Sequence, residues 1–171
     1  VTRIVHDSGV PLRAIRIDDS TRESFTVNER STNKQYRFVL PGPQLTCADQ
    51  AQCLDETRRA AASAEFVVAS GSLPPGVPPD WYQQVADVCR DVGVPLILDT
   101  SGGGLTHVSS GVFLLKASLR ELRECVGREL ATQTDQLVAA RELVETGVAQ
   151  SVVVSLGSQG ALLATVRHSQ R

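Results

Sequence analysis

The sequence predicts an α/β fold, in which helices cover both faces of a parallel sheet and a small β lid precedes them. From residue 43 onward, short apolar runs alternate with helical segments, and this alternation is typical of βα units. One such run, residues 66–69, leads into Ser-Gly-Ser-Leu-Pro-Pro-Gly at residues 70–76, as expected of a buried strand that ends in a fixed loop. Residues 1–42 instead contain short, partly polar strands, so we predict two parts, 1–42 and 43–171.

The first part begins with the last turns of a helix over residues 2–8, which ends at Gly9. Residues 10–17 are predicted to form a strand because Leu12, Ala14 and Ile15 lie among polar neighbours. Two further strands are expected over residues 24–27 and 35–40, and the polar residues 28–34 suit an exposed hairpin loop.

Pro41-Gly42-Pro43 marks the boundary, and the remaining elements follow in alternation. Ser and Thr at helix starts, and Gly after helix ends, set the limits of the helices. We expect helices over 46–62, 79–91, 118–126 and 134–146, and strands over 66–70, 95–99, 112–116, 151–155 and 161–166.

Composition excludes several classes of function. The net charge is −2 with scattered basic residues, so neither nucleic acid nor an anionic membrane is favoured as a partner. No apolar run approaches the roughly 20 residues that span a bilayer. The four cysteines form no Cys-x-x-Cys pair, so we expect free thiols and a cytoplasmic protein. Because no methionine occurs, we expect a piece of a longer protein.

The predicted strands deliver polar or small residues to one edge of the sheet. The residues that end or follow these strands are Ser70 and Ser72, Asp99, Lys116, and Ser155 and Gly157. Right-handed crossovers bring parallel strand ends together. Hydroxyls, one cation and glycines suit phosphate groups. The same residue types also dominate ordinary turns, so pattern alone leaves both interpretations open.

Three segments carry a family resemblance: residues 70–76, residues 35–42 (Gln-Tyr-Arg-Phe-Val-Leu-Pro-Gly) and residues 152–162. The chain resembles the ribokinase-like sugar kinases of the PfkB family, and among them the minor-type 6-phosphofructokinases. The resemblance implies that the complete protein uses ATP and Mg2+ to convert fructose 6-phosphate to fructose 1,6-bisphosphate. It also makes a homodimer through the β lid plausible. The alternatives are 1-phosphofructokinase or tagatose-6-phosphate kinase activity, or a non-catalytic binding fragment or degenerate relative.

The resemblance also implies which residues bind the sugar phosphate. Thr21-Arg22-Glu23-Ser24 is similar to the family's Thr-Arg-x-Asn segment, whose arginine grips the phosphate, although Ser24 replaces the asparagine. A guanidinium fork matches phosphate oxygens in a bidentate manner. Ser72 resembles the serine that contacts the same substrate. We therefore expect Arg22, Glu23, Ser24 and Ser72 to bind substrate.

The ATP side is expected in two further segments. Lys116-Ala117-Ser118-Leu119-Arg120-Glu121 is similar to the family's Lys-Pro-Asn-x-x-Glu, in which the glutamate helps to organise Mg2+. Ser118 and Glu121 also match a capping box. The segment from Ser155 resembles the nucleotide loop, although a tight turn explains its glycines equally well. The resulting assignment is Lys116, Ser118, Ser155, Gly157, Ser158 and Gly160 for ATP and Glu121 for the metal.

Catalysis in this family uses an aspartate of a Gly-Ala-Gly-Asp motif, which does not occur in the sequence. The family's Gly-Gly-x-x-Asn segment does not occur either. We therefore expect the catalytic aspartate beyond the C-terminus and predict that the 171 residues alone have no kinase turnover. Asp99 is expected to position the strand end and not to replace the missing base.

Overall fold

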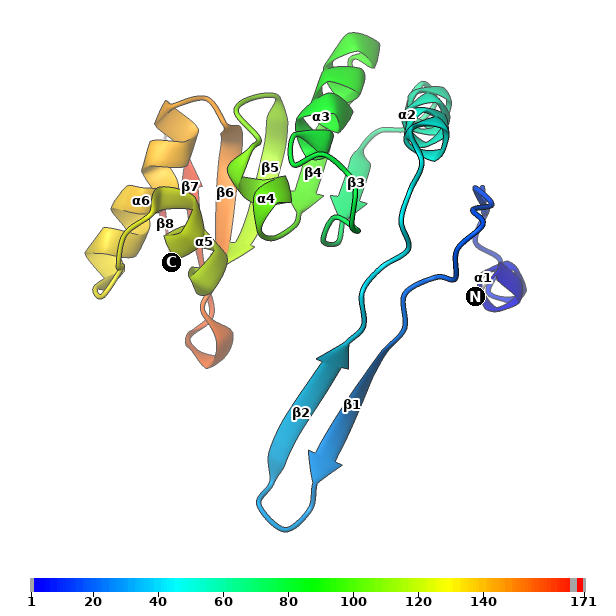
Figure 1. Cartoon of the computed structure of the whole chain (residues 1–171). Coiled ribbons are helices and arrows are strands. Elements are labelled where there is room, and N and C mark those ends of the chain that lie inside the picture. Colours follow the sequence, from blue (N-terminus) through cyan, green and yellow to red (C-terminus); the bar gives the residue numbers. More distant parts are fainter. Residues whose placement is uncertain (1, 167–168, 171) are drawn as a thin grey trace. The chain divides into compact units, whose positions relative to one another are not determined.

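The computed structural model describes residues 2–166 and 169–170. By contacts the chain divides into two units (Figure 1). One unit comprises Val1–Glu56 with Pro74–Val77, and the other comprises Thr57–Leu73 with Pro78–Arg171.

The first unit contains a short helix, α1 (Thr2–Asp7), and an antiparallel hairpin of β1 (Ser24–Glu29) and β2 (Lys34–Val39). The predicted helix and both predicted hairpin strands are confirmed. Helix α1 stops at Gly9, which has φ 74° and donates its N–H to the His6 carbonyl at 3.0 Å. The hairpin turn places Asn33 at φ 55°, a left-handed conformation that asparagine tolerates.

The strand predicted over residues 10–17 is wrong, because these residues form an irregular segment. Alternation of apolar and polar side chains favours a strand only when a neighbouring strand accepts and donates its backbone hydrogen bonds. No strand elsewhere in residues 2–166 and 169–170 pairs with this segment.

Helix α2 (Cys47–Ala61) begins where the sequence predicted a cap at Thr46. The Asp49 backbone N–H donates to Thr46 Oγ1 at 3.1 Å, and the Thr46 hydroxyl and N–H donate to Asp49 Oδ2 at 2.6 and 2.9 Å. These reciprocal bonds satisfy donors that a helix start otherwise leaves unpaired. They also hold the pKa of Asp49 below its ordinary value.

The second unit is built on a six-stranded sheet in the order β3-β4-β5-β6-β7-β8. The first four strands are parallel, and β7 and β8 join them antiparallel. The predicted parallel sheet and its strands are therefore confirmed. The strands are β3 (Val67–Ser70), β4 (Leu96–Asp99), β5 (Val112–Ser118), β6 (Ala149–Ser155), β7 (Ala161–Thr165) and β8 (Ser169–Gln170).

The helices of this unit are α3 (Trp81–Val92), α4 (Gly103–Thr106), α5 (Leu119–Val126) and α6 (Gln133–Glu145). Helix α6 begins at a Thr132–Asp135 capping box and not at Thr134, because only Thr132 is placed to exchange hydrogen bonds with Asp135. Helix α4 forms in the glycine run for which no helix was expected. Across the described part of the chain, no helix has the length and apolar character needed to cross a membrane.

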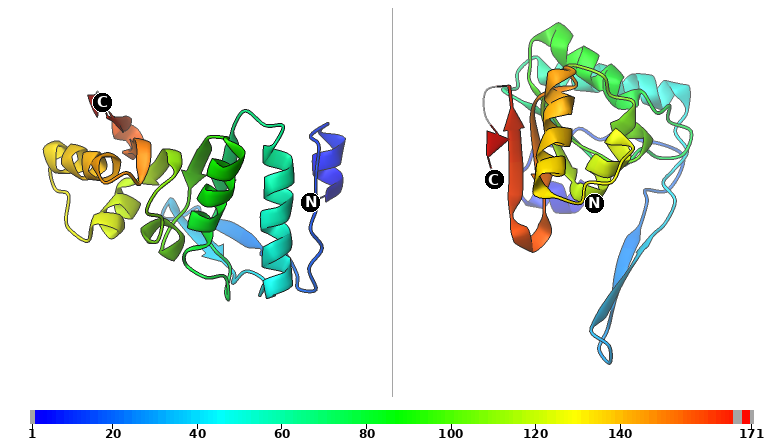
Figure 2. Two further views of the ribbon diagram at one scale, coloured as in Figure 1. Left: turned by 90° about the horizontal axis from the view of Figure 1, so that it is seen from above. Right: turned by 90° about the vertical axis from the view of Figure 1, so that its left-hand side faces the viewer.

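The core of the second unit lies between the sheet and helices α3, α5 and α6, which pack on the same face (Figures 1 and 2). Alternate strand residues on that face, among them Leu98, Leu115 and Val152, are fully buried. Helices were expected on both faces, but these three helices cover one. On the opposite face Val68 and Leu163 remain 66% and 40% exposed, so the helices described here leave part of that face open.

Candidate functional site

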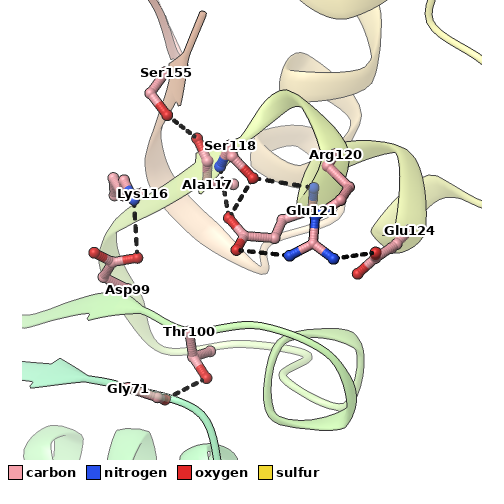
Figure 3. Close-up of polar contacts among 10 residues, drawn as sticks. All are labelled: Gly71, Asp99, Thr100, Lys116, Ala117, Ser118, Arg120, Glu121, Glu124 and Ser155. Atoms are coloured by element: carbon pink, nitrogen blue, oxygen red, sulfur yellow. Dashed lines mark hydrogen bonds and ion pairs between the residues drawn. The ribbon is translucent and has the colours of Figure 1, made fainter. Parts of the chain in front are cut away.

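The carboxyl ends of the parallel strands share one edge of the sheet, as the sequence predicted. Ser70 lies opposite Asp99, Asp99 opposite Lys116, and Ser118 opposite Ser155 in the strand register. Because paired residues of parallel strands point to the same face, this register aligns the polar side chains along the edge. Figure 3 shows them with the adjoining start of α5.

Lys116 and Asp99 form an ion pair across this edge, with Nζ and Oδ1 separated by 3.1 Å. Both side chains are partly exposed, at 39% and 42%. Salt and water therefore screen the pair. Lys116 has hydrogen-bonding capacity for a further anion, because an ammonium group carries three donors.

Ser118 and Glu121 form the capping box at the start of α5 (Figure 3). The Ser118 hydroxyl and N–H both donate to Glu121 Oε2 at 2.7 Å, and the Glu121 N–H donates to Ser118 Oγ at 3.3 Å. Burial alone would raise the pKa of Glu121, but the Ser118 hydrogen bonds, with Lys116 and Arg120 nearby, outweigh it and lower that pKa. The carboxylate is therefore ionised at neutral pH.

The segment after β6 forms a tight turn around a 3-10 helix, Gly157–Gln159. The turn is closed by the Leu156 N–H, which donates to the Gly160 carbonyl at 2.8 Å. Gly157 and Gly160 have φ values of 61° and 90°, and a Cβ at either position would meet nothing within 4 Å. Ser158 is exposed in the same turn. The structure therefore agrees with a tight turn and is also compatible with a nucleotide loop, because a turn of this kind leaves space for a ligand beside its backbone.

Ser155 anchors this turn to the neighbouring strand. Its hydroxyl donates to the Ala117 carbonyl at 3.4 Å (Figure 3). Ser155 and Ser118 therefore lie side by side at the ends of β6 and β5.

The loop that carries Ser72 is held by two residues that sequence analysis did not single out. Tyr82 and Thr100 both donate their hydroxyls to the Gly71 carbonyl, at 2.7 and 2.8 Å. Burial raises the pKa of Tyr82, so its hydroxyl keeps its proton at neutral pH and remains a donor. Thr100 directly follows the end of β4, and that position was the available signal for it.

Arg22, Glu23 and Ser24 lie in the first unit, at the entry to the hairpin. All three residues are exposed, and Ser24 is the first residue of β1. The Glu23 carbonyl accepts a hydrogen bond from the Leu40 N–H at 3.2 Å, which extends the hairpin ladder by one pair.

Within residues 2–166 and 169–170, no cluster of three or more His, Cys, Asp or Glu side chains is arranged to hold a metal ion. The predicted role of Glu121 therefore requires other ligands, such as water or phosphate oxygens, which Mg2+ commonly retains.

A family model described as pfkB family carbohydrate kinase matches residues 2–171. The chain belongs to the pfkB family. It is 71% identical over 168 residues to the ATP-dependent 6-phosphofructokinase isozyme 2 of Mycobacterium tuberculosis, covering 98% of this chain and 50% of that protein. The isozyme 2 of Escherichia coli is 37% identical over 161 residues, covering 93% of this chain and 52% of that protein. The pfkB-family chain thus spans about half the length of these relatives.

Solved structures give the same assignment of fold. Phosphofructokinase-2 from Escherichia coli in complex with potassium has a TM-score of 0.91 at 34% identity, over 99% of this chain and 55% of that one. A structure of the tetrameric inhibited form of the same enzyme also has a TM-score of 0.91 and 34% identity, over 99% of this chain and 56% of that one. The predicted ribokinase-like fold of this pfkB-family chain is therefore confirmed.

Proposed function

We propose that the protein containing this chain transfers the γ-phosphate of ATP to fructose 6-phosphate and forms fructose 1,6-bisphosphate. The observation that carries the proposal is the 71% identity to an ATP-dependent 6-phosphofructokinase isozyme 2 over 98% of this chain. The polar edge at the carboxyl ends of the strands supports it, since ligands of open α/β sheets bind beyond that edge.

The sugar phosphate is assigned to Arg22, Glu23, Ser24 and Ser72. The Arg22 guanidinium supplies paired donors for a phosphate, and the serine hydroxyls and Glu23 suit the sugar and its hydroxyl groups. Ser72 follows the strand end at Ser70, in a segment whose small residues permit close approach of a ligand. This assignment makes phosphate the group that governs affinity, because it carries the charge.

The nucleotide is assigned to Lys116, Ser118, Ser155 and the turn that contains Gly157, Ser158 and Gly160. The fit is supported by the open space beside both glycines, which lets phosphate oxygens approach the backbone of the turn. Glu121 is ionised and contributes negative charge toward Mg2+, through water because Ser118 already donates twice to its Oε2. Bound Mg2+ would screen the charge of the ATP phosphates.

The chain alone is proposed to bind ligands without turning over. The sequence contains no Gly-Ala-Gly-Asp motif, and the Asp99 carboxylate is engaged in an ion pair with Lys116 at 3.1 Å. We therefore expect that ligand binding to this chain can be measured without phosphoryl transfer taking place.

Calorimetric titration of the 171-residue chain tests these assignments. Fructose 6-phosphate is expected to bind more tightly than fructose 1-phosphate or tagatose 6-phosphate. Arg22→Lys keeps the charge but removes the fork, so it should weaken binding about tenfold, while Arg30→Lys at the hairpin tip should leave binding unchanged. Equal binding of the three sugars, or equal effects of the two substitutions, contradicts the proposal. Fructose 1,6-bisphosphate formed by the purified chain with MgATP contradicts the predicted inactivity.

We also propose that two copies pair through the hairpin. Phe25, Val27, Tyr36 and Phe38 lie on one face of it and are 45% to 53% exposed, and the two phenyl rings stack at 4.9 Å. An isolated two-stranded hairpin is only marginally stable in water, so an apolar face of this kind favours an interaction surface. A second copy is the proposed occupant, in keeping with the tetrameric form described for the Escherichia coli enzyme.

Sedimentation velocity tests the pairing. Phe38→Asp places a charge on the aromatic face and should convert dimers to monomers. Thr26→Asp places the same charge on the opposite face, where Thr26 lies beside Arg37, and should leave the dimer intact. The proposal fails if the unsubstituted chain is monomeric or if both variants dissociate equally.

A cytoplasmic location is proposed as well. All four cysteines are free, and three of them, Cys53, Cys89 and Cys125, are buried or half-buried. Burial raises the pKa of these three thiols, which reduces the reactive thiolate. Free thiols are typical of a reducing compartment.

A further inference from the structure

The Gly71 carbonyl, just beyond the end of β3, accepts hydrogen bonds from two side-chain hydroxyls. It accepts from Tyr82 at 2.7 Å and from Thr100 at 2.8 Å, and the two donors come from α3 and from the residue after β4. Tyr82 is 8% exposed and Thr100 is 3% exposed. Both lone pairs of the carbonyl are therefore occupied by hydroxyls that have little access to water.

The preceding peptide, which joins Ser70 to Gly71, is constrained as well. The Gly71 N–H donates to the Asp99 carbonyl at 3.0 Å, which continues the β3–β4 ladder beyond Ser70. Gly71 has φ 120°, a conformation that residues with a Cβ rarely adopt. The peptide that joins Gly71 to Ser72 is thus held by two hydrogen bonds to its own carbonyl, next to a preceding peptide that Asp99 holds and a turn that favours glycine.

Helix α4 encloses this arrangement. A Cβ added to Gly104 would lie 2.9 Å from Tyr82 Cδ2, 3.1 Å from Thr100 Oγ1 and 3.2 Å from Leu73 Cγ. No ordinary side chain fits there, so the glycine allows α4 to approach the two hydroxyl donors closely.

We propose that Tyr82 and Thr100 are positioning residues for the sugar-phosphate site, because they orient the Gly71–Ser72 peptide and thereby place Ser72. If this peptide rotated, two buried hydroxyls would lose their shared acceptor, so the buried hydroxyls oppose rotation. The inference rests on the proposed function of Ser72 as a substrate-binding residue. Neither Tyr82 nor Thr100 is itself assigned a contact with the ligand.

The test uses variants of the 171-residue chain that keep shape and remove a hydroxyl. Tyr82→Phe and Thr100→Val each remove one donor, and Thr100→Ser retains the donor as a rescue variant. Thr146→Val is the matched control, since the Thr146 hydroxyl also donates to a backbone carbonyl, that of Glu142 at 2.7 Å, outside this loop. Circular dichroism establishes that each variant is folded.

Two readouts separate the role of the loop from the role of the ligand. Amide hydrogen exchange at Gly71, followed by NMR, should be about tenfold faster in Tyr82→Phe and Thr100→Val, and unchanged in Thr100→Ser and Thr146→Val. The dissociation constant for fructose 6-phosphate should rise severalfold in the first two variants alone, while that for MgATP stays constant.

The outcomes distinguish the two hypotheses. Unchanged exchange at Gly71 overturns the positioning role whatever the ligand does. Faster exchange with unaltered fructose 6-phosphate affinity also overturns it, because the loop would then be free to move without consequence for binding. If the unsubstituted chain binds no fructose 6-phosphate, the proposed function fails and the sugar-phosphate role fails with it. Exchange at Gly71 then still decides whether the two hydroxyls hold the loop.

Discussion

The Ser118 hydroxyl both caps helix α5 and belongs to the candidate nucleotide site, so its removal should affect stability and the site together. In Ser118→Ala the Glu121 N–H loses its acceptor, and Glu121 Oε2 loses the hydroxyl, one of its two donors at 2.7 Å. Loss of an N-cap costs about 1 kcal/mol, and loss of a hydrogen bond to a charged group costs about 1.5 kcal/mol or more. Since one hydroxyl serves both bonds, we expect a loss of about 2 kcal/mol in the free energy of unfolding.

Urea denaturation of the 171-residue chain at pH 7 measures this loss as a lower transition midpoint at unchanged slope. Thr132→Ala removes the equivalent hydroxyl from the capping box of α6, where both partners are exposed. It should therefore destabilise the chain less than Ser118→Ala. A loss below about 0.5 kcal/mol for Ser118→Ala, or equal losses for the two variants, would refute the reasoning from burial.

The effect of Ser118→Ala should also depend on pH. The folded state lowers the pKa of Glu121 below its ordinary value of 4.5, so the carboxylate stabilises the fold above that value. This contribution is lost as the pH falls through the lower folded-state pKa. The difference between the unsubstituted chain and Ser118→Ala should therefore shrink in acid toward the contribution of the N-cap alone. If the difference in the free energy of unfolding between the two chains is constant from neutral to acidic pH, the assigned hydrogen bond from the Ser118 hydroxyl to the ionised Glu121 carboxylate is contradicted.

Two further predictions concern packing in the second unit. Leu115→Ala, at a fully buried position on the helix-covered face, should lower the free energy of unfolding by about 3 kcal/mol, whereas Leu163→Ala, at a 40% exposed position, should lower it much less. Comparable midpoints in denaturation would contradict this assignment of the two faces. Gly104→Ala should destabilise the chain and speed exchange of the Thr100 amide, because the added Cβ would meet Tyr82 at 2.9 Å. Gly103→Ala, whose Cβ would lie 3.3 Å from Pro79, should have a smaller effect, and the reverse order would refute the argument from close packing.

Much of the fold was predictable because its signals are local. The apolar run before Ser70 forms β3, and Ser118 and Glu121 form a capping box, both as predicted. A strand pattern and an N-cap each depend on residues within a few positions of one another, so both can be recognised in the sequence. Elements that depend on distant partners were missed. Residues 10–17 have the alternation of a strand but no paired neighbour in the described structure. The start of α6 was misplaced for a local reason, because Thr132 and not Thr134 exchanges hydrogen bonds with Asp135.

In the candidate site, too, features with local signals were predicted and features that depend on distant residues were not. The strand ends and the family motifs placed Lys116, Ser118 and Ser155 on one edge, and the register confirms that placement. The hydroxyls that hold Gly71 were not predicted, because Tyr82 and Thr100 lie 11 and 29 residues from it along the chain.

The class of fold, most of its helices and strands and the family could be predicted from the sequence, because they depend on the period of apolar residues, on turn residues and on motif spacing. The folded chain was needed to establish which strand face the helices bury, that Lys116 is paired with Asp99, and which hydroxyls orient the loop before Ser72. Those features arise from distances between residues far apart in sequence, and chain folding alone sets such distances.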